Sequence, residues 1–264
     1  MSKWRPIPLN CLYVIPDVHG QLHQLKLICN RIFPLRKSDG GHDKLVMLGD
    51  YIDRDFDGPE VVDFLIAAKK KYKDQLILLC GNHEQMLLDV AANKSSDVYR
   101  MWMRVGGEAT LSRYLQRANE PLSNPYELPH WRIGDFIPKE HLEFYRSLLT
   151  YYELDEFIFV HGGCDPTIPL YKQSKEELIW DRRLNNFVQL SIKNNQPLLW
   201  DKTIIAGHNS TQDGKLLITE KFMMLDCSYA RKLLVAELNS MEAFIAGKKK
   251  GRLVKFLLKD GWQK

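Results

Sequence analysis

Six side chains of types that commonly bind metal ions follow short apolar runs in this chain. They are two carboxylates, three imidazoles and one amide: Asp17, His19, Asp50, Asn82, His161 and His208. This set of hard and borderline donors, with no thiolate, suits Mn²⁺, Fe or Zn²⁺ better than a soft metal. Six ligands exceed the need of one open catalytic site and match two ions that share a bridging carboxylate. Two such ions clamp a phosphoryl group and acidify a bridging water, and the resulting hydroxide attacks phosphorus in line.

The apolar runs that precede these residues predict buried strands. They cover residues 12–15, 44–48, 76–80, 157–160 and 203–206, and most end beside a glycine. Residues that carry function concentrate in loops at the ends of such elements. We therefore expect five strands to present the candidate ligands at their C-terminal ends.

Helical spacing follows the first three strands. Apolar residues recur from 22 to 32, a helix is expected at about 61–72 after Pro59, and another at 85–92. Strand, motif and helix in this order, three times over, favour an α/β layered core. Beyond residue 203 the chain is strand-like, with expected strands at 215–219, 222–225, 232–237, 243–246 and 253–258.

Residues 93–150 interrupt this alternation. Helices are expected near 99–102, 111–118 and 139–149, and a long irregular loop with four prolines at 120–138. Long loops in compact domains often serve as lids or binding surfaces. Because no repeat or linker is evident, we predict one domain over 1–264, with a helical, Pro-rich insertion at about 93–150.

Composition narrows the class of protein. The net charge of +4 is too small to indicate nucleic-acid binding by itself. Five cysteines without a CxxC pair indicate a reduced, cytoplasmic protein. No apolar run reaches membrane-spanning length, and the prolines near the N-terminus argue against a signal peptide. His141 lies in no motif and is expected at the surface, whereas Trp102 is expected to contribute packing.

Five motifs occur in a fixed order along the chain. They are Asp-x-His-Gly at 17–20, Gly-Asp-x-x-Asp-Arg at 49–54, Gly-Asn-His-Glu at 81–84, His-Gly at 161–162 and Gly-His at 207–208. Together they resemble the phosphoprotein phosphatase family of calcineurin-like metallophosphoesterases, in particular bacterial and phage-type serine/threonine phosphatases and diadenosine tetraphosphatases. The resemblance extends from residue 12 to about residue 228. It implies an α/β fold, a four-layer α-β-β-α sandwich with the metals at the strand ends.

The resemblance also implies a role for each ligand. One metal is bound by Asp17 and His19, the other by Asn82, His161 and His208, and Asp50 bridges the two. The implied cofactors are therefore two divalent ions, Mn²⁺ first among the candidates.

Further residues are assigned to catalysis and substrate binding by the same resemblance. His83 is the general acid, and Asp53 orients it. Arg54 binds the phosphate oxygens, and Asn82 is included among the substrate contacts. The segment 180–182 resembles the stretch that supplies a second phosphate-binding arginine in phage-type enzymes, so Arg182 is assigned, with the adjacent Arg183 as the alternative. Guanidinium groups suit this role because they bind phosphate bidentately.

One residue departs from the family pattern. Asp55 stands where the family usually has glycine after the Asp-Arg pair. A carboxylate there is expected to lie beside the phosphate-binding arginine and to repel anionic substrates. The departure leaves the substrate preference open and does not affect the metal ligands.

Three functions are consistent with these residues. The first is a binuclear phosphatase acting on phosphomonoesters, foremost phosphoserine and phosphothreonine in proteins, or on small phosphoesters. The second is a hydrolase of dinucleoside polyphosphates or of nucleotide-capped RNA ends. The third is a non-catalytic metallo-domain that binds phosphorylated partners, which would not need His83 and Asp53. Alone, Asn82 or Asp50 could be a helix cap, but the five motifs together favour an enzyme.

Overall fold

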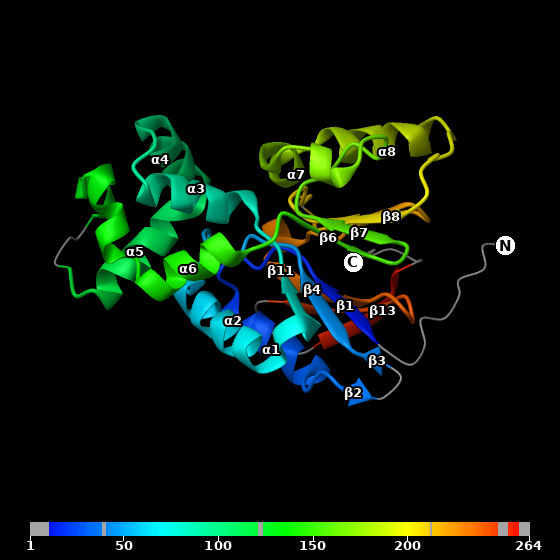
Figure 1. Cartoon of the computed structure of the whole chain (residues 1–264), viewed down its shortest axis with the longest axis horizontal. Helices are drawn as coiled ribbons and strands as arrows, with labels where there is room; N and C mark the ends of the chain where they lie inside the picture. Colours follow the sequence, from blue (N-terminus) through cyan, green and yellow to red (C-terminus); the bar gives the residue numbers. More distant parts are fainter. Residues whose placement is uncertain (1–10, 39–40, 121–123, 212, 248–252, 259–264) are drawn as a thin grey trace.

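The computed structural model describes residues 11–38, 41–120, 124–211, 213–247 and 253–258. Two β-sheets lie on each other, and helices cover their outer faces (Figure 1). The first sheet has the order β13-β12-β11-β1-β4-β5 and the second has the order β6-β7-β8-β10-β9. The predicted four-layer α-β-β-α arrangement is confirmed.

The first sheet has a parallel centre. β1 pairs in parallel with β4, and β4 with β5, whereas β11, β12 and β13 add antiparallel strands on the other side of β1. Helices α1 and α2 cover its outer face (Figure 1). The bounds are β1 Leu12–Ile15, α1 Leu22–Ile32, β4 Lys44–Met47, α2 Gly58–Tyr72, β5 Leu76–Leu78, β11 Lys232–Glu237, β12 Glu242–Gly247 and β13 Leu253–Leu257. A small hairpin, β2 Lys37–Ser38 and β3 Gly41–His42, lies between α1 and β4.

The second sheet also has a parallel centre, formed by β7, β8 and β10, with β6 and β9 antiparallel at its edges. Helices α7 and α8 cover it (Figure 1). The bounds are β6 Tyr151–Leu154, β7 Phe157–Val160, α7 Lys175–Trp180, α8 Arg183–Lys193, β8 Thr203–Ala206, β9 Leu217–Ile218 and β10 Phe222–Met224.

Alternate residues of each central strand serve different layers of the core. Val14 of β1 and Val46 of β4 face the second sheet, while Ile15 and Met47 pack against the helices. Successive side chains of a strand point to opposite faces, so a strand buried on both sides must be apolar throughout. This requirement explains why the central strands appear in the sequence as unbroken apolar runs.

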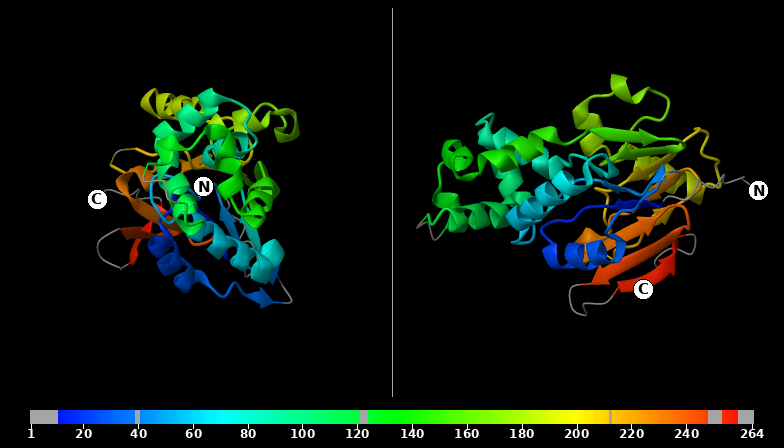
Figure 2. Two further views of the ribbon diagram at one scale, coloured as in Figure 1. Left: turned by 90° about the vertical axis from the view of Figure 1, so that its left-hand side faces the viewer. Right: turned by 60° about the horizontal axis from the view of Figure 1, so that its bottom comes forward.

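A helical lobe extends beyond the end of the sheets at which β5 leads into α3 (Figure 2). It contains α3 Asn82–Ala91, α4 Ser96–Trp102, α5 Glu108–Arg117 and α6 Lys139–Ser147. A π-helical turn, Met103–Gly107, joins α4 to α5, and Gly106 within it has a φ of 119° that favours glycine. The expected irregular loop at 120–138 is wrong in part, because 3₁₀ helices form at Pro125–Glu127 and His130–Phe136. Short i→i+3 turns are compatible with the prolines that begin them.

Among the described helices and strands, several have no counterpart in the sequence-based expectations, including β2, β3, β6 and α8. In α8 the buried face is formed by Leu184, Val188 and Ser191. Phe187 and Leu190 are also apolar but exposed, which blurs the one-sided pattern by which an amphipathic helix is recognised. Among the described residues, no helix combines the length and the apolar character that crossing a membrane requires.

Candidate metal and catalytic site

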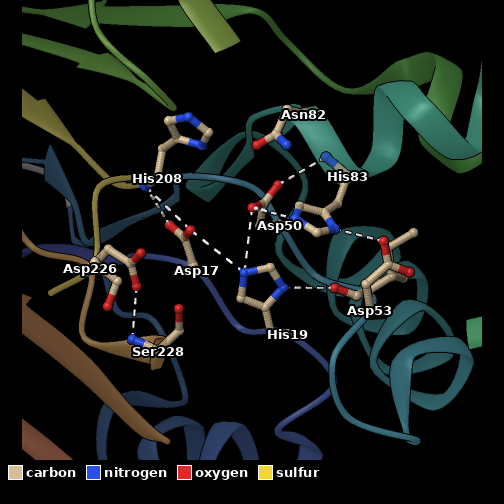
Figure 3. Close-up of polar contacts among 12 residues, drawn as sticks. Asp17, His19, Asp50, Asp53, Asn82, His83, His208, Asp226 and Ser228 are labelled. Carbon is tan, nitrogen blue, oxygen red and sulfur yellow. Dashed lines mark hydrogen bonds and ion pairs between the residues drawn. The ribbon is translucent and has the colours of Figure 1, made fainter. Parts of the chain in front are cut away.

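The loops that follow β1, β4, β5, β7 and β8 meet at one place, and Asp50 lies at its centre (Figure 3). Its two carboxylate oxygens face different imidazoles. Oδ2 lies 3.4 Å from Nε2 of His19, and Oδ1 lies 3.3 Å from Nε2 of His161. His208 joins the His161 side, where ligand-type atoms of Asp50, His161 and His208 all lie within 4.8 Å of one another. A carboxylate placed in this way can serve two cations at once.

The two remaining candidate ligands lie on opposite sides of Asp50. Asp17 Oδ2 lies 3.8 Å from His19 Nε2, on the first side. Asn82 Oδ1 lies 3.0 Å from His161 Nε2, on the second. Asp17 also accepts a hydrogen bond from the amide of His208 at 3.0 Å. The structure thus brings together all six predicted ligands around Asp50.

Backbone contacts fix the direction in which the imidazoles point. Nδ1 of His19 contacts the carbonyl of Ile52 at 2.9 Å, and Nδ1 of His161 contacts that of Leu48 at 2.9 Å. A ring that donates from Nδ1 to a carbonyl presents the lone pair of Nε2, as metal-binding histidines do.

Buried polar atoms without hydrogen-bond partners also cluster here. Among the described residues, His19 Nε2, Asp50 Oδ2 and His208 Nε2 are buried and have none. Burial of an unpaired polar atom is costly, and divalent cations would satisfy these atoms. The donor set therefore fits the metal ions that the sequence predicts.

The electrostatics favour the protonation states of ligands at His19, His208 and Asp50, whereas burial, and after it Asp226 and Asp50, raises the pKa of Asp17. Burial, and after it the neighbouring Arg54, lowers the pKa of His19. Burial and His161 lower the pKa of His208 to about 2. Burial alone would raise the pKa of Asp50, but the surrounding imidazoles, His161 foremost, hold it below its ordinary value. Neutral imidazoles around an ionised carboxylate are the forms that bind metals.

His83 differs from the other three histidines of the site. Its Nδ1 lies 2.6 Å from Oδ2 of Asp53, and both side chains are buried. Burial opposes protonation of His83, but the carboxylates of Asp50 and Asp53 outweigh it and raise the pKa. Because His83 Nε2 is 3.7 Å from Asp50 Oδ2, distance alone would also permit it to be a ligand. Its carboxylate partner and raised pKa favour a proton donor instead.

Asp53 is held from the helical lobe. Nε1 of Trp102 in α4 donates to Asp53 Oδ2 at 2.8 Å, and the amide of Asp53 donates to Oγ1 of Thr110 in α5 at 2.8 Å. The neighbouring Arg54 has a positive φ of 65° and donates its amide to the carbonyl of Gly106 at 3.1 Å. The expectation that Trp102 only packs is therefore incomplete.

Arg182 and Arg183 point to different surroundings. Arg183 Nε donates to Oδ1 of Asp181 at 2.7 Å, and the side chain lines a separate cavity of about 620 Å³ with Phe187 and Trp200. Arg182, by contrast, is close enough to His208 to lower its pKa further, after burial and His161. Arg183 thus lines a separate cavity, and Arg182 stays the predicted second phosphate-binding arginine.

Glu84 joins the turns that carry the ligands. Its carboxylate accepts hydrogen bonds from the amides of Asp50, Tyr51 and Gly81, at 2.9, 2.8 and 2.9 Å. Burial raises its pKa to about 8. One buried side chain therefore fixes the β4 loop against the start of α3.

Several residues at or near the site were not assigned from sequence. Asp226 is buried beside Asp17 and follows β10, so it repeats the strand-end pattern that identified the ligands. Trp102, Thr110 and Arg231 carry no local sequence signal. His141 was expected at the surface but is buried, because it lies between the helical lobe and α2 and bonds to Tyr114 of α5 and Asp63 of α2.

Part of the chain matches the profile of a known family. The family profile of the calcineurin-like phosphoesterases matches residues 12–106, which contain the first three motifs. This part of the chain is therefore similar to the calcineurin-like phosphoesterases.

Individual relatives differ in how much of the chain they match. The serine/threonine-protein phosphatase 4 catalytic subunit of Candida glabrata is 35% identical over 154 residues, which are 58% of this chain and 38% of that protein. The alignment thus spans well under half of that relative's length. The structure of a candidate diadenosine tetraphosphatase has a TM-score of 0.56 at 15% identity and covers 96% of this chain and 95% of its own. A cold-active protein-tyrosine phosphatase from a psychrophilic Shewanella has a TM-score of 0.57 at 20% identity, with 93% and 80% covered. Both structures share the fold.

Proposed function

We propose that this chain is a binuclear metal-dependent phosphatase that hydrolyses phosphomonoesters, foremost phosphoserine and phosphothreonine in proteins. The observation that carries the proposal is the position of Asp50. Its two oxygens face separate sets of candidate ligands, and the buried His83–Asp53 pair lies beside it. A site that only bound phosphate would not need a proton donor held in this way.

In this proposal the ligands divide around Asp50. Asp17 and His19 bind one ion and Asn82, His161 and His208 bind the other, with Mn²⁺ preferred and Fe or Zn²⁺ as alternatives. When bound, two such ions would neutralise phosphoryl oxygens and acidify the attacking water. The neutral imidazoles and the ionised Asp50 keep their lone pairs available for this role.

The phosphoryl group is oriented by arginines. In-line transfer spreads negative charge over the equatorial oxygens, and donors aimed there stabilise it. Arg54, whose backbone the helical lobe holds, and Arg182, near His208, approach the site from different loops. Asn82 offers its amide nitrogen as a further donor to the same group.

His83 supplies the proton for the leaving alkoxide. Asp53 contacts Nδ1, so Nε2 is the ring nitrogen left to give the proton. The raised pKa keeps the imidazole protonated closer to neutral pH. Hydrogen bonds with Trp102 and Thr110 hold Asp53 in place. The helical lobe therefore supports both the proton donor and the adjacent phosphate-binding Arg54.

The cytoplasmic location is part of the proposal, since all five cysteines are free thiols. We also propose that residues 1–264 form a single domain in which the helical segment at 93–150 is an insertion. Residues 1–10 and 259–264 lie outside the described part of the chain. Cleavage of phosphoanhydrides would use the same residues and is an alternative outcome of the assay below.

The direct test is a panel of substrates assayed with Mn²⁺ and with chelator. We expect turnover of 4-nitrophenyl phosphate and of a phosphoserine peptide with Mn²⁺, and none of either in chelator. Turnover of diadenosine tetraphosphate alone would assign the phosphoanhydride function instead. Failure of every substrate to react, with metal bound, would favour a binding domain and contradict the proposal.

A further inference from the structure

A cavity of about 220 Å³ opens beside His19, away from the large cavity that Arg183 lines. Three loops that are distant in sequence line it: the β1 loop with His19, the β4 loop with Arg54 and Asp55, and the segment after β10 with Ser228, Tyr229 and Arg231. His19 and Arg54 belong to the proposed catalytic site, so the cavity adjoins it directly. The segment after β10 has no role in the mechanism above.

Arg231 brings a second guanidinium group to this cavity. Its Nη1 lies 3.3 Å from Oδ2 of Asp55, and the side chain remains largely exposed. Asp55 Oδ1 also accepts from the amide of Phe56 at 3.0 Å. Asp55, which stands where the family usually has glycine, thus forms an ion pair with Arg231, 176 positions away in sequence. Asp55 was expected mainly to repel anions, and the ion pair gives it a second effect, to hold a cation at the cavity.

A buried hydroxyl lies on the same wall. Ser228 is 6% exposed, lines the cavity, and interacts through its side chain with Asp226. Its amide donates to Oδ1 of Asp226 at 2.8 Å, which fixes the turn (Figure 3).

The walls of the cavity are held by backbone. Gly20 has a φ of 67°, and a Cβ there would lie 2.6 Å from the carbonyl oxygen of Asp55, so the β1 and β4 loops are in close contact. Arg231 closes the turn after β10 in the left-handed region, with its amide bonded to the carbonyl of Ser228 at 2.8 Å. These constraints hold the loops that bring Arg54 and Arg231 to the same cavity.

We propose that this cavity binds a second phosphate group, carried by the substrate next to the phosphate that is hydrolysed. The inference rests on the proposed function and narrows its substrate class. Two guanidinium groups provide more donors than the two oxygens of a carboxylate can use, and they suit the non-bridging oxygens of a phosphate group. Arg54 and Arg231 together carry one more positive charge than the carboxylate of Asp55 neutralises, so these cavity side chains favour an anion.

Adjacent phosphates have two chemical sources, a phosphoanhydride and neighbouring phosphorylated residues of a peptide. The experiment therefore uses four probes with Mn²⁺: 4-nitrophenyl phosphate, a peptide with one phosphoserine, the same peptide with two adjacent phosphoserines, and diadenosine tetraphosphate. The test variant is Arg231→Gln. The matched control is Arg183→Gln, which also removes an exposed arginine paired with an aspartate but lines the other cavity.

Arg231→Gln is expected to lower kcat/KM by about 10- to 100-fold for a substrate with adjacent phosphates, as loss of a charge-assisted hydrogen bond does. The two singly phosphorylated probes should change by no more than about twofold, within the usual range for surface substitutions. Arg183→Gln should leave all four near wild type. Metal content and Tm should be unchanged in both variants.

Selective loss on diadenosine tetraphosphate identifies the phosphoanhydride as the source, and selective loss on the doubly phosphorylated peptide identifies neighbouring phosphoserines. Equal losses on all probes, no loss on any, or a wild-type protein that hydrolyses only the singly phosphorylated probes would overturn the inference and leave the proposed function standing. A wild-type protein inactive on all four with Mn²⁺ would overturn both.

Discussion

Trp102 donates a hydrogen bond from its indole Nε1 to Oδ2 of Asp53 at 2.8 Å. The same carboxylate oxygen contacts Nδ1 of His83 at 2.6 Å. The indole is fully buried, and a Cβ on Gly107 would lie 2.4 Å from its ring, so the side chain has little freedom to move. The helical lobe therefore positions the proposed proton donor in part through this rigid contact.

Trp102→Phe should test this positioning role. It removes the indole N–H and keeps an aromatic ring in the pocket. We expect kcat for alkyl phosphates to fall by roughly 10-fold or more, as loss of a hydrogen bond to a charged group predicts, with little change in KM or metal content. Trp131→Phe, at an exposed tryptophan of the same lobe, is the control. A raised KM with unchanged kcat would show that Trp102 supports substrate binding and not Asp53.

His83→Asn should remove the proton donor and leave the ligands in place. The expected loss in kcat for alkyl phosphates is on the order of 10²–10⁴. Aryl phosphates should lose less, because their leaving groups need less protonation. His23→Asn, at an exposed histidine, is the control. Equal losses on both kinds of leaving group, or a missing metal ion, would count against the role.

Arg182 and Arg183 should behave differently when each is changed to alanine. Arg182→Ala should lower kcat/KM by the equivalent of about 2–4 kcal/mol, as loss of a charged contact to a reacting group does. Arg183 is largely exposed and paired with Asp181, so its loss should cost no more than about 0.5 kcal/mol. A larger loss of kcat/KM in Arg183→Ala than in Arg182→Ala would show that Arg183, and not Arg182, contacts the phosphate.

Most candidate site residues could be predicted because each has a signal in its own short stretch of sequence. Each ligand follows a buried strand, and the apolar run and the polar residue stand side by side in the chain. Asp226 shows the same pattern after β10, so it too could have been assigned. Strand ends of a layered fold converge, so a local pattern was enough to predict a shared location.

The supports of the site could not be predicted, because they join distant segments. Trp102 and Asp53 are 49 positions apart, and Arg231 and Asp55 are 176 apart. No spacing rule links such pairs; only the packing of the helical lobe and of the β10 loop brings them together. His141 illustrates the same limit, since its burial depends on Tyr114 and Asp63 in other helices.

His141 should make stability depend on pH. Burial lowers its pKa, although the facing carboxylate of Asp63 opposes the shift; Arg117 also lowers it and Glu140 opposes it weakly. In the unfolded chain the pKa returns to about 6.5. As pH falls through that value, His141 binds more protons in the unfolded state than in the folded state. The free energy of unfolding should therefore fall as pH decreases. His141→Gln should remove part of this slope.

Thermal melts between pH 8 and pH 5 would measure the effect, with wild type and His141→Gln compared at each pH. The difference in Tm should narrow as pH falls, because only the wild type loses stability by protonation of this residue. A constant difference across the range would show that the pKa of His141 is the same in the folded and unfolded chain.

The central claim is that two ions share Asp50, and metal analysis of protein reconstituted with Mn²⁺ tests it most directly. Wild type should approach two ions per chain. Asp50→Asn should lose most of both, because its two oxygens face the two sets of ligands, whereas Asp53→Asn, which touches no candidate ligand atom in the proposal, should keep them. Two ions per chain in Asp50→Asn, or a wild type that binds none, would contradict the account.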